Sequence, residues 1–149
     1  MYNQILVPLD GSELAEMALP HAESLARKYD ATLVLLSIVT PPVITGRGAK
    51  AMELFEEQID TLMQDAEGYL DKLKERLTGK QIKTETYTKL GPVVKSILVF
   101  ADNDNVDLVI IASHGRSGLG RFFFGSVAAG ILNRIGQPLM VIRCKDCPE

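Results

Sequence analysis

Short apolar runs alternate along the chain with longer segments in which apolar residues recur at every third or fourth position. Unbroken apolar runs are typical of strands buried on both faces, as in a parallel sheet. Such runs are found at Gln4–Leu9, Thr32–Val39, Asp107–Ser113 and Pro138–Ile142. A further segment, Gln81–Lys89, alternates charged residues with isoleucine and threonine, which predicts an edge strand with one wet face.

The segments between these runs have helical spacing. Ser12 is a good N-cap for a helix that extends to Tyr29, and Pro20 within it predicts a kink or a locally broken turn. Pro92 opens a second short helix, and a third is expected over Ser126–Ile135.

The longest predicted helix follows a loop at Thr40–Lys50 and ends at Gly79. Its acidic residues come early and its basic residues come late, an order that complements the helix dipole. One apolar stripe runs along it. The residues of this stripe are Phe55, Ile59, Leu62, Met63, Ala66, Leu70, Leu73 and Leu77.

Strands and helices therefore alternate from one end of the chain to the other. This alternation predicts an α/β fold, with a parallel sheet and helices on both of its faces. Residues 1–149 show no internal repeat and no linker, so we expect one domain. In such a sheet a ligand binds at the carboxyl ends of the strands, at the point where the strand order reverses.

Composition and charge exclude several classes of protein. A chain of 149 residues that is 46% apolar needs neither disulfides nor a metal to fold. Its apolar runs are far shorter than the ~18 residues of a membrane span. The net charge of -3 and the pI of about 5.4 argue against a nucleic-acid interface, which would need a basic patch.

The ends of the chain bear on its location. The N-terminal residues lack a basic leader and meet Asp10 within the first apolar run, so we expect a cytoplasmic protein. Cys144 and Cys147 are too few for a zinc site and do not open a helix as a redox pair normally does. Two thiols on a solvated tail are the favoured interpretation.

Two strand ends carry the candidate chemistry. Asp10-Gly11-Ser12 follows the first strand, and the glycine-rich segment Gly115–Gly125 follows the fourth. Glycines allow the backbone to approach a ligand closely, and the helix that begins at Ser126 presents N–H groups suited to an anion. Arg116 and Arg121 add positive charge. Neither a P-loop nor the glycine motif of dinucleotide-binding folds occurs.

These residues resemble the universal stress protein family, in particular its ATP-binding branch. The resemblance covers essentially the whole chain, from Ile-Leu-Val-Pro-Leu-Asp-Gly-Ser at its start to Gly-Ser-Val-Ala before the last strand. The family's nucleotide motif is Gly, two residues, Gly, nine residues, Gly, then Ser or Thr. Gly115, Gly125 and Ser126 match this motif, but Ala112 replaces its first glycine.

The resemblance implies a Rossmann-like, open five-stranded parallel sheet of order 3-2-1-4-5, with ATP at the carboxyl ends of strands 1 and 4. Asp10 would hold the ribose, and Ile38 would flank the adenine. Mg²⁺, or Mn²⁺ in its place, would sit among the phosphates and not on protein side chains. The nucleotide-binding residues implied in this way are Pro8, Leu9, Asp10, Ile38, Ile111, Ala112, Gly115, Arg116, Gly125, Ser126, Val127 and Ala128.

The resemblance also implies homodimers, with the last strand at an edge of the sheet. The residues from Leu139 to Ile142 are all apolar, and free backbone groups at such an edge invite pairing with another strand. Two-fold pairing with a second copy would satisfy these groups. We therefore expect a homodimer joined through this strand.

The leading functional hypothesis is an ATP-binding regulatory protein of the stress response, in which nucleotide binding changes a surface that a partner protein reads. A slow ATPase is an alternative, although the sequence lacks a P-loop lysine and an obvious water-positioning residue. A non-nucleotide interaction module is the other alternative, and Ala112 is its best support.

Some candidate residues also have a purely structural interpretation. Asp10 could cap the first helix with Ser12, and Ser126 is an N-cap candidate as well as a phosphate ligand. His114 has no carboxylate paired with it in sequence, which favours a structural or phosphate-neighbour role over that of a general base. The rings of Phe122–Phe124 could pack back onto the fold or form a partner patch.

Overall fold

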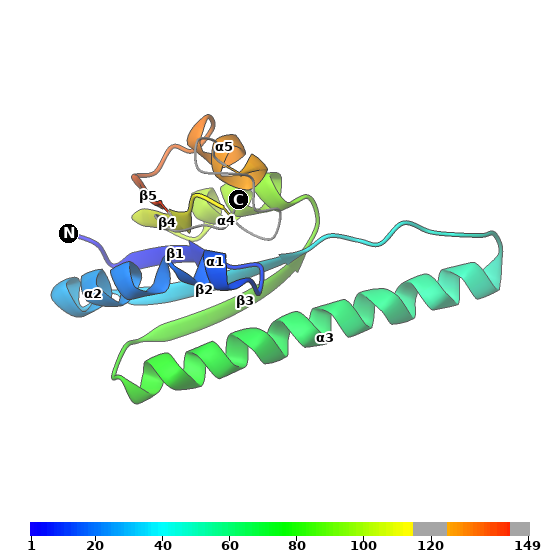
Figure 1. Ribbon diagram of the computed structural model, residues 1–149, viewed down its shortest axis with the longest axis horizontal. Coiled ribbons are helices and arrows are strands. Elements are labelled where there is room, and N and C mark those ends of the chain that lie inside the picture. Colours follow the sequence, from blue (N-terminus) through cyan, green and yellow to red (C-terminus); the bar gives the residue numbers. More distant parts are fainter. Residues whose placement is uncertain (115–124, 144–149) are drawn as a thin grey trace.

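Parallel strands form one sheet in the computed structural model, which describes residues 1–114 and 125–143 (Figure 1). Their order across the sheet is β3-β2-β1-β4-β5, which confirms the order 3-2-1-4-5. The strand order reverses between β1 and β4, so the crevice expected for a ligand lies at the carboxyl ends of these two strands. The strands are β1 (Gln4–Pro8), β2 (Thr32–Val39), β3 (Thr84–Leu90), β4 (Leu108–Ala112) and β5 (Leu139–Ile142).

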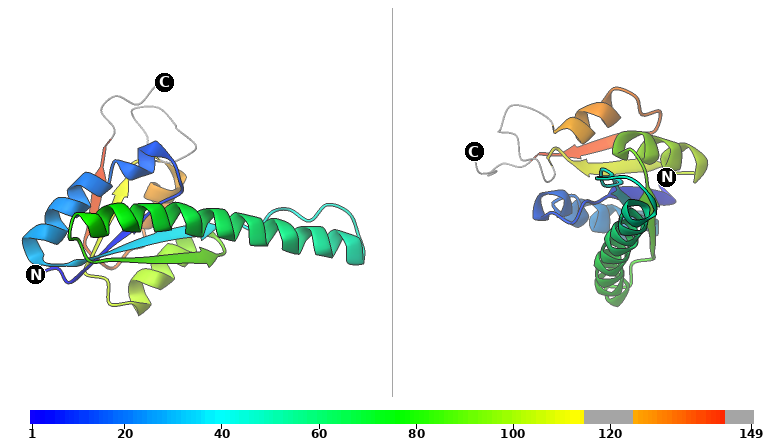
Figure 2. Two further views of the ribbon diagram at one scale, coloured as in Figure 1. Left: turned by 90° about the horizontal axis from the view of Figure 1, so that it is seen from below. Right: turned by 90° about the vertical axis from the view of Figure 1, so that its right-hand side faces the viewer.

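Helices cover both faces of this sheet, as the alternating pattern predicts (Figure 2). On one face lie α1 (Glu13–Glu16), α2 (Leu19–Tyr29) and α3 (Ala49–Gly79). On the other lie α4 (Val93–Asn103) and α5 (Ser126–Leu132). The α/β fold with a parallel sheet is therefore confirmed.

Two hydrophobic cores result, because successive side chains of a strand point to opposite faces of the sheet. Leu33 and Leu35 of β2 pack in the core beneath α2 and α3, whereas Val34 and Leu36 pack in the core beneath α4 and α5. All four side chains are buried. Central strands need apolar residues at every position for this reason, and the unbroken apolar runs of the sequence reflect it.

The break predicted at Pro20 is present. The segment from Ser12 to Tyr29 is divided into α1 and α2, and Pro20 occupies the first turn of α2, where a missing N–H removes no intrahelical bond. Ser12 caps α1, since its Oγ accepts a hydrogen bond from the backbone N–H of Ala15 at 3.1 Å. The cap at Ser12 and the break at Pro20 therefore place the turn from the strand into the helices directly after β1.

The two edges of the sheet differ in character. β3 lies at one edge and exposes Glu85 and Lys89, which confirms the edge strand predicted for this segment. β5 lies at the other edge, and its four residues are all half-buried apolar side chains.

The long helix α3 is covered along only part of its length. Its buried residues, Leu70, Leu73 and Leu77, all lie toward its C-terminal end. Its N-terminal half extends past the carboxyl ends of the strands (Figures 1 and 2). Within residues 1–114 and 125–143, neither α3 nor any other helix is both long enough and apolar enough to cross a membrane.

Candidate functional site

The turn after β1 holds Asp10 in a fixed position. Gly11 adopts a positive φ of 84°, which favours glycine, and this allows the chain to turn sharply from the strand into α1. Asp10 Oδ1 then accepts hydrogen bonds from the backbone N–H of Ser12 at 2.9 Å and from its hydroxyl at 2.6 Å. Ser12 therefore caps the helix, and Asp10 holds Ser12 in position through these two hydrogen bonds.

The exit of β4 and the start of α5 are tied together by the backbone. The N–H of Gly125 donates to the carbonyl oxygen of Ser113 at 2.8 Å. A Cβ at position 125 would lie 3.3 Å from that oxygen and 3.5 Å from the Cα of His114. Glycine is required here because two backbone segments approach each other closely.

The first turn of α5 begins directly at this contact. Gly125 is the N-cap, so the expectation that Ser126 caps the helix is wrong; Ser126 is the first helical residue and its side chain is exposed. The N–H groups of the first helical residues have no acceptor within the helix, since the first intrahelical bond runs from Ala129 to Gly125. They form a small electropositive surface at the end of β4.

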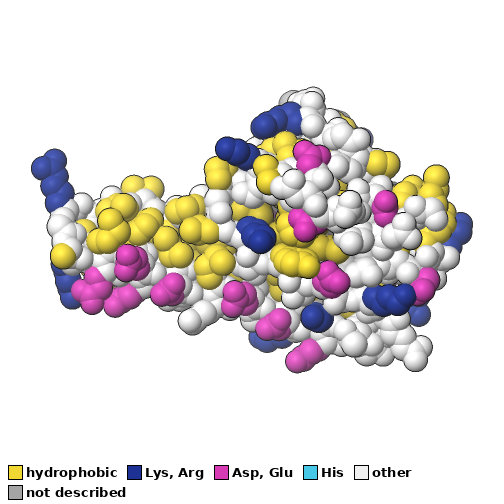
Figure 3. Space-filling model, turned by 180° about the vertical axis from the view of Figure 1, so that it is seen from behind, with side chains coloured by type: hydrophobic (Ala, Val, Ile, Leu, Met, Phe, Trp, Pro, Cys, Tyr) yellow, Lys and Arg dark blue, Asp and Glu magenta, His cyan; other side chains and the backbone are white. Residues whose placement is uncertain are grey.

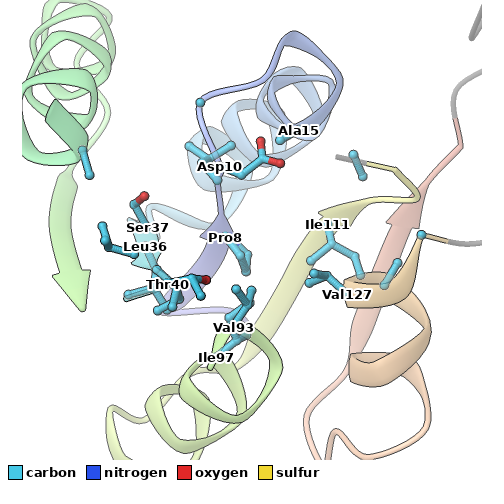
Figure 4. A pocket seen from close by; sticks show the side chains of 18 of the residues that line it. Pro8, Asp10, Ala15, Leu36, Ser37, Thr40, Val93, Ile97, Ile111 and Val127 are labelled. Carbon is cyan, nitrogen blue, oxygen red and sulfur yellow. The ribbon is translucent and has the colours of Figure 1, made fainter. Parts of the chain in front are cut away.

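A cavity of about 510 Å³ opens at the carboxyl ends of the strands, between these two turns (Figure 4). Ile111 and Val127 line one side of it, Val93 lines another, and Asp10 and Pro8 line the wall that follows β1. This volume falls in the range of small-molecule sites. Of the residues predicted for the site, those that line the cavity are Pro8, Leu9, Asp10, Ile38, Ile111, Ala112, Gly125, Ser126, Val127 and Ala128.

The rest of the predicted glycine-rich segment falls outside the described residues. Gly115 and Arg116, which were predicted to bind phosphate, belong to it, as do Arg121 and Phe122–Phe124. The cysteines of the tail likewise lie outside the described residues.

Sequence reasoning missed one wall of the cavity. The helix α3 contributes Leu62, Asp65, Ala66 and Tyr69 to the lining, although it is distant in sequence from both turns. The hydroxyl of Tyr69 donates to Glu16 Oε1 at 2.9 Å. Burial, reinforced by this hydrogen bond, raises the pKa of the Tyr69 phenol well above its ordinary value.

The strand β2 supplies a second group of unpredicted lining residues. Ser37 is a buried hydroxyl at the carboxyl end of an otherwise apolar strand, and Thr40 follows directly after that strand. A lone serine in a run of leucine, valine and isoleucine was the signal that could have identified this position.

His114 is buried at the base of the cavity. Its Nδ1 lies 3.0 Å from the hydroxyl of Ser113, and its Nε2 has no hydrogen-bond partner among the described residues. The pairing with a hydroxyl and not a carboxylate agrees with the structural or phosphate-neighbour role. His21, in contrast, is exposed on α2.

The described residues do not assemble a metal centre of their own. Residues 1–114 and 125–143 contain no group of three or more histidine, cysteine, aspartate or glutamate side chains able to hold a metal ion. The described residues offer the cavity apolar burial, a fixed carboxylate at Asp10 and backbone N–H donors at the start of α5. Further polar side chains of the lining include Ser37, Asp65, Tyr69 and His114.

The fold and this cavity define a class: α/β proteins with a ligand pocket at the switch point of a parallel sheet. Comparison with known proteins identifies the family. The model of the universal stress protein family matches residues 1–143. The chain belongs to the universal stress protein family.

A relative of known structure supports the assignment. Universal stress protein MJ0577 of Methanocaldococcus jannaschii is 27% identical over 158 residues, which cover 98% of each chain. Its solved structure superposes with a TM-score of 0.87 and covers 98% of this chain and 99% of that chain.

Two more distant structures share the fold and carry nucleotides. A universal stress protein in complex with cAMP has a TM-score of 0.65 at 20% identity, covering 95% of this chain and 97% of its own. A family protein from Arabidopsis thaliana with AMP bound has a TM-score of 0.61 at 16% identity, covering 95% of this chain and 91% of its own.

Proposed function

We propose that this protein is a regulatory protein of the stress response that binds ATP at the carboxyl ends of β1 and β4. The observation that carries the proposal is the junction at Gly125. There a glycine permits close backbone approach, and the N–H groups that open α5 border the same cavity as Asp10 and Ile38. The whole described chain would then act as one nucleotide-binding domain.

The proposed arrangement assigns a part of the nucleotide to each wall. Ile38 flanks the adenine, Asp10 and the backbone at Pro8 and Leu9 hold the ribose, and Ile111 with Ala112 lines it. The phosphates lie over Gly125 and the first turn of α5, with Gly115 and Arg116 as further ligands. The cavity volume and its mixed apolar and N–H lining support this arrangement.

The energetics are consistent with micromolar binding, which corresponds to about 8 kcal/mol. Three or four charge-assisted hydrogen bonds to phosphate, at ~1.5–3 kcal/mol each, together with burial of the base, would supply this amount. They would also absorb a loss of ~1–3 kcal/mol from the methyl group of Ala112.

The choice of an adenine nucleotide is supported by two members of the family, whose structures contain cAMP and AMP. ATP is the more specific proposal, because a cavity bordered by the start of a helix suits a chain of phosphates. Mg²⁺, or Mn²⁺, would be held by those phosphates.

Ser126 offers a direct test of the phosphate position. The variant Ser126→Asp places a carboxylate in the first turn of α5, where an acidic residue stabilises the helix but repels a phosphate. We expect ATP with Mg²⁺ to bind the wild type in calorimetry and to bind Ser126→Asp at least about tenfold more weakly, a loss of about 1.4 kcal/mol.

The neutral variant Ser126→Asn is the matched control, because it has nearly the same shape as aspartate without its charge. We expect it to bind ATP within about threefold of the wild type, since it adds no like charge. Equal binding by all three proteins would show that phosphate does not lie at this helix. The absence of any heat with wild-type protein, and of any nucleotide released from it on denaturation, would rule against the proposal as a whole.

One observation favours a second candidate function. Ala112 lines the cavity at the end of β4, where the ATP-binding motif that this chain resembles has a glycine. A protein of this fold that acts only as an interaction module would tolerate that methyl group. Lack of nucleotide binding by both the wild type and Ala112→Gly would favour this candidate.

A further inference from the structure

A large part of α3 projects from the molecule as an arm. The helix has 31 residues and is about 46 Å long at 1.5 Å per residue. The strand β2, with eight residues, is only about 26 Å long. We call residues 49–63 of α3 the arm; the helix extends past the sheet in Figure 1 and in the left-hand view of Figure 2.

The arm carries an apolar row that its own chain covers only in part, since Phe55, Ile59 and Met63 are half-buried. The row continues the line of the buried residues Leu70, Leu73 and Leu77, because its members recur at spacings of three and four. The side chains of Met52 and Leu62 are 48% and 41% exposed. The residues of this row are Met52, Phe55, Ile59, Leu62 and Met63.

An acidic row runs along one side of the apolar row. Glu53, Glu56 and Asp60 are spaced by three and four residues, so they share one flank of the helix, and Glu67 continues the line. Within residues 49–63 the opposite flank carries Ala51 and Gln58, which are uncharged, and Asp65 continues that flank beyond the arm. Figure 3 shows hydrophobic side chains along the projecting helix with Asp and Glu side chains along one edge.

We propose that the arm is the docking site for a partner protein that presents an amphipathic helix with an apolar face and lysine or arginine along one side. An apolar row with one acidic border matches such a helix in both hydrophobicity and charge. An apolar row exposed to water does not stabilise the helix, and exposed apolar patches typically mark a surface that another molecule covers.

A second copy of the chain fits this surface less well. Two arms related by a two-fold axis that runs across the helices would lie antiparallel, and the same flank of each helix would meet that of the other. The two acidic rows would then face each other, and like charges at such spacing repel. A two-fold axis along the helices would place the acidic row of one arm against the uncharged flank of the other, where it gains no ion pairs. Charge therefore favours a basic partner over self-association.

The arm lies next to the proposed nucleotide site, because Leu62 also lines the cavity. The inference goes beyond the proposed function and holds whether or not ATP binds. Its test is therefore carried out on the full chain without nucleotide, so that failure of one proposal leaves the other intact.

The test uses two labelled synthetic helical peptides with leucine at every third and fourth position. One carries lysine along one side of the leucine row, and the other carries glutamate there. We expect fluorescence anisotropy at low salt to show binding of the lysine peptide and about tenfold weaker binding of the glutamate peptide, with the difference shrinking at high salt.

Residues of α3 inside and outside the two rows provide matched variants. Leu62→Ser lies in the apolar row, and Leu54→Ser removes an equally exposed leucine, 49%, from the outer face. Glu56→Lys lies in the acidic row, and Glu75→Lys makes the same change of charge at an exposed position of α3 outside the arm. We expect Leu62→Ser and Glu56→Lys each to weaken binding about tenfold, and the other two to leave it unchanged.

Three results would overturn the inference. The first is equal binding of both peptides, and the second is an equal effect of the row variants and their matched controls. The third is a sedimentation mass for the wild type that falls in Leu62→Ser but not in Leu54→Ser, which would show that a second copy covers the arm.

Discussion

The methyl group of Ala112 is the smallest feature with a large expected effect on ligand binding. It lines the cavity at the last position of β4, where the resembled motif has glycine. Removal of a methyl group from a tight site is worth ~1–3 kcal/mol, so Ala112→Gly should strengthen ATP binding by roughly five- to 150-fold. Calorimetric titration of both proteins measures the change; unaltered or weaker affinity in Ala112→Gly would contradict the proposed position of the ribose.

Tyr69 makes stability sensitive to alkaline pH. Because burial and the hydrogen bond to Glu16 raise the pKa of its phenol in the folded protein, the folded state disfavours the tyrosinate. This contribution to stability is complete below the ordinary tyrosine value of 10 and is lost as the pH rises above it.

The variant Tyr69→Phe removes the titrating group. We expect its free energy of unfolding at neutral pH to fall by about 0.5–1.5 kcal/mol, the net value of one hydrogen bond. Above pH 10 the difference between the variant and the wild type should shrink, since only the wild type loses this contribution. Urea denaturation across this range provides the measurement, and a difference that stays constant with pH would show that the phenol is not held neutral by the fold.

Local rules at strand ends explain why much of the candidate site could be predicted. Asp10 and Gly125 stand where a strand ends and a helix begins, and parallel strands bring such ends to one edge of the sheet. Tyr69 could not be found in this way, since only the packing of α3 on the sheet brings it to the cavity. The N-cap at Gly125 was missed because the backbone bond to Ser113, and not the preference of serine, fixes where the helix begins.

At the level of elements, the contact between α4 and α5 depends on one glycine. A Cβ at Gly130 would lie 2.9 Å from a methyl carbon of Val94, whose branched side chain cannot easily turn away. Overpacking costs ~1–3 kcal/mol, and the better helix propensity of alanine offsets at most about 1 kcal/mol. We therefore expect Gly130→Ala to lower the free energy of unfolding by up to about 2 kcal/mol.

Gly68 in α3 is the matched control, because a Cβ there meets no other atom within 4 Å. The variant Gly68→Ala should stabilise the protein by about 0.5–1 kcal/mol through helix propensity alone. Urea denaturation of both variants provides the measurement. If Gly130→Ala were stabilised as much as Gly68→Ala, α5 would not pack on α4 at this distance.

The strands and helices also show how much of the fold the sequence predicts. The parallel strands and the break at Pro20 follow from local patterns of apolar residues and from the missing N–H of proline, whereas the strand order was implied by the family resemblance. The apolar stripe of α3 predicted a helix, but it did not predict which surface packs against the stripe. A periodic pattern records that one face is apolar, and it does not show whether the sheet or another molecule lies against that face.

At the scale of the whole molecule, the outer edge of β5 is expected to join two copies. Ile142 accepts a hydrogen bond from the N–H of Ser113, so its backbone groups face β4. The backbone groups of its neighbour Val141 point to the opposite side, away from the sheet. With half-buried apolar side chains along the whole strand, this edge is suited to pairing with its counterpart on a second copy.

Val141→Pro should separate such a dimer without disturbing the sheet, because it removes an N–H that β4 does not use. The matched control is Thr86→Pro on the β3 edge, where the backbone groups likewise point away from the neighbouring strand β2. Sedimentation velocity should give twice the chain mass of 16.3 kDa for the wild type and for Thr86→Pro, and a single chain mass for Val141→Pro. A wild-type protein that sediments as one chain, or a Val141→Pro variant that remains paired, would move the interface away from β5.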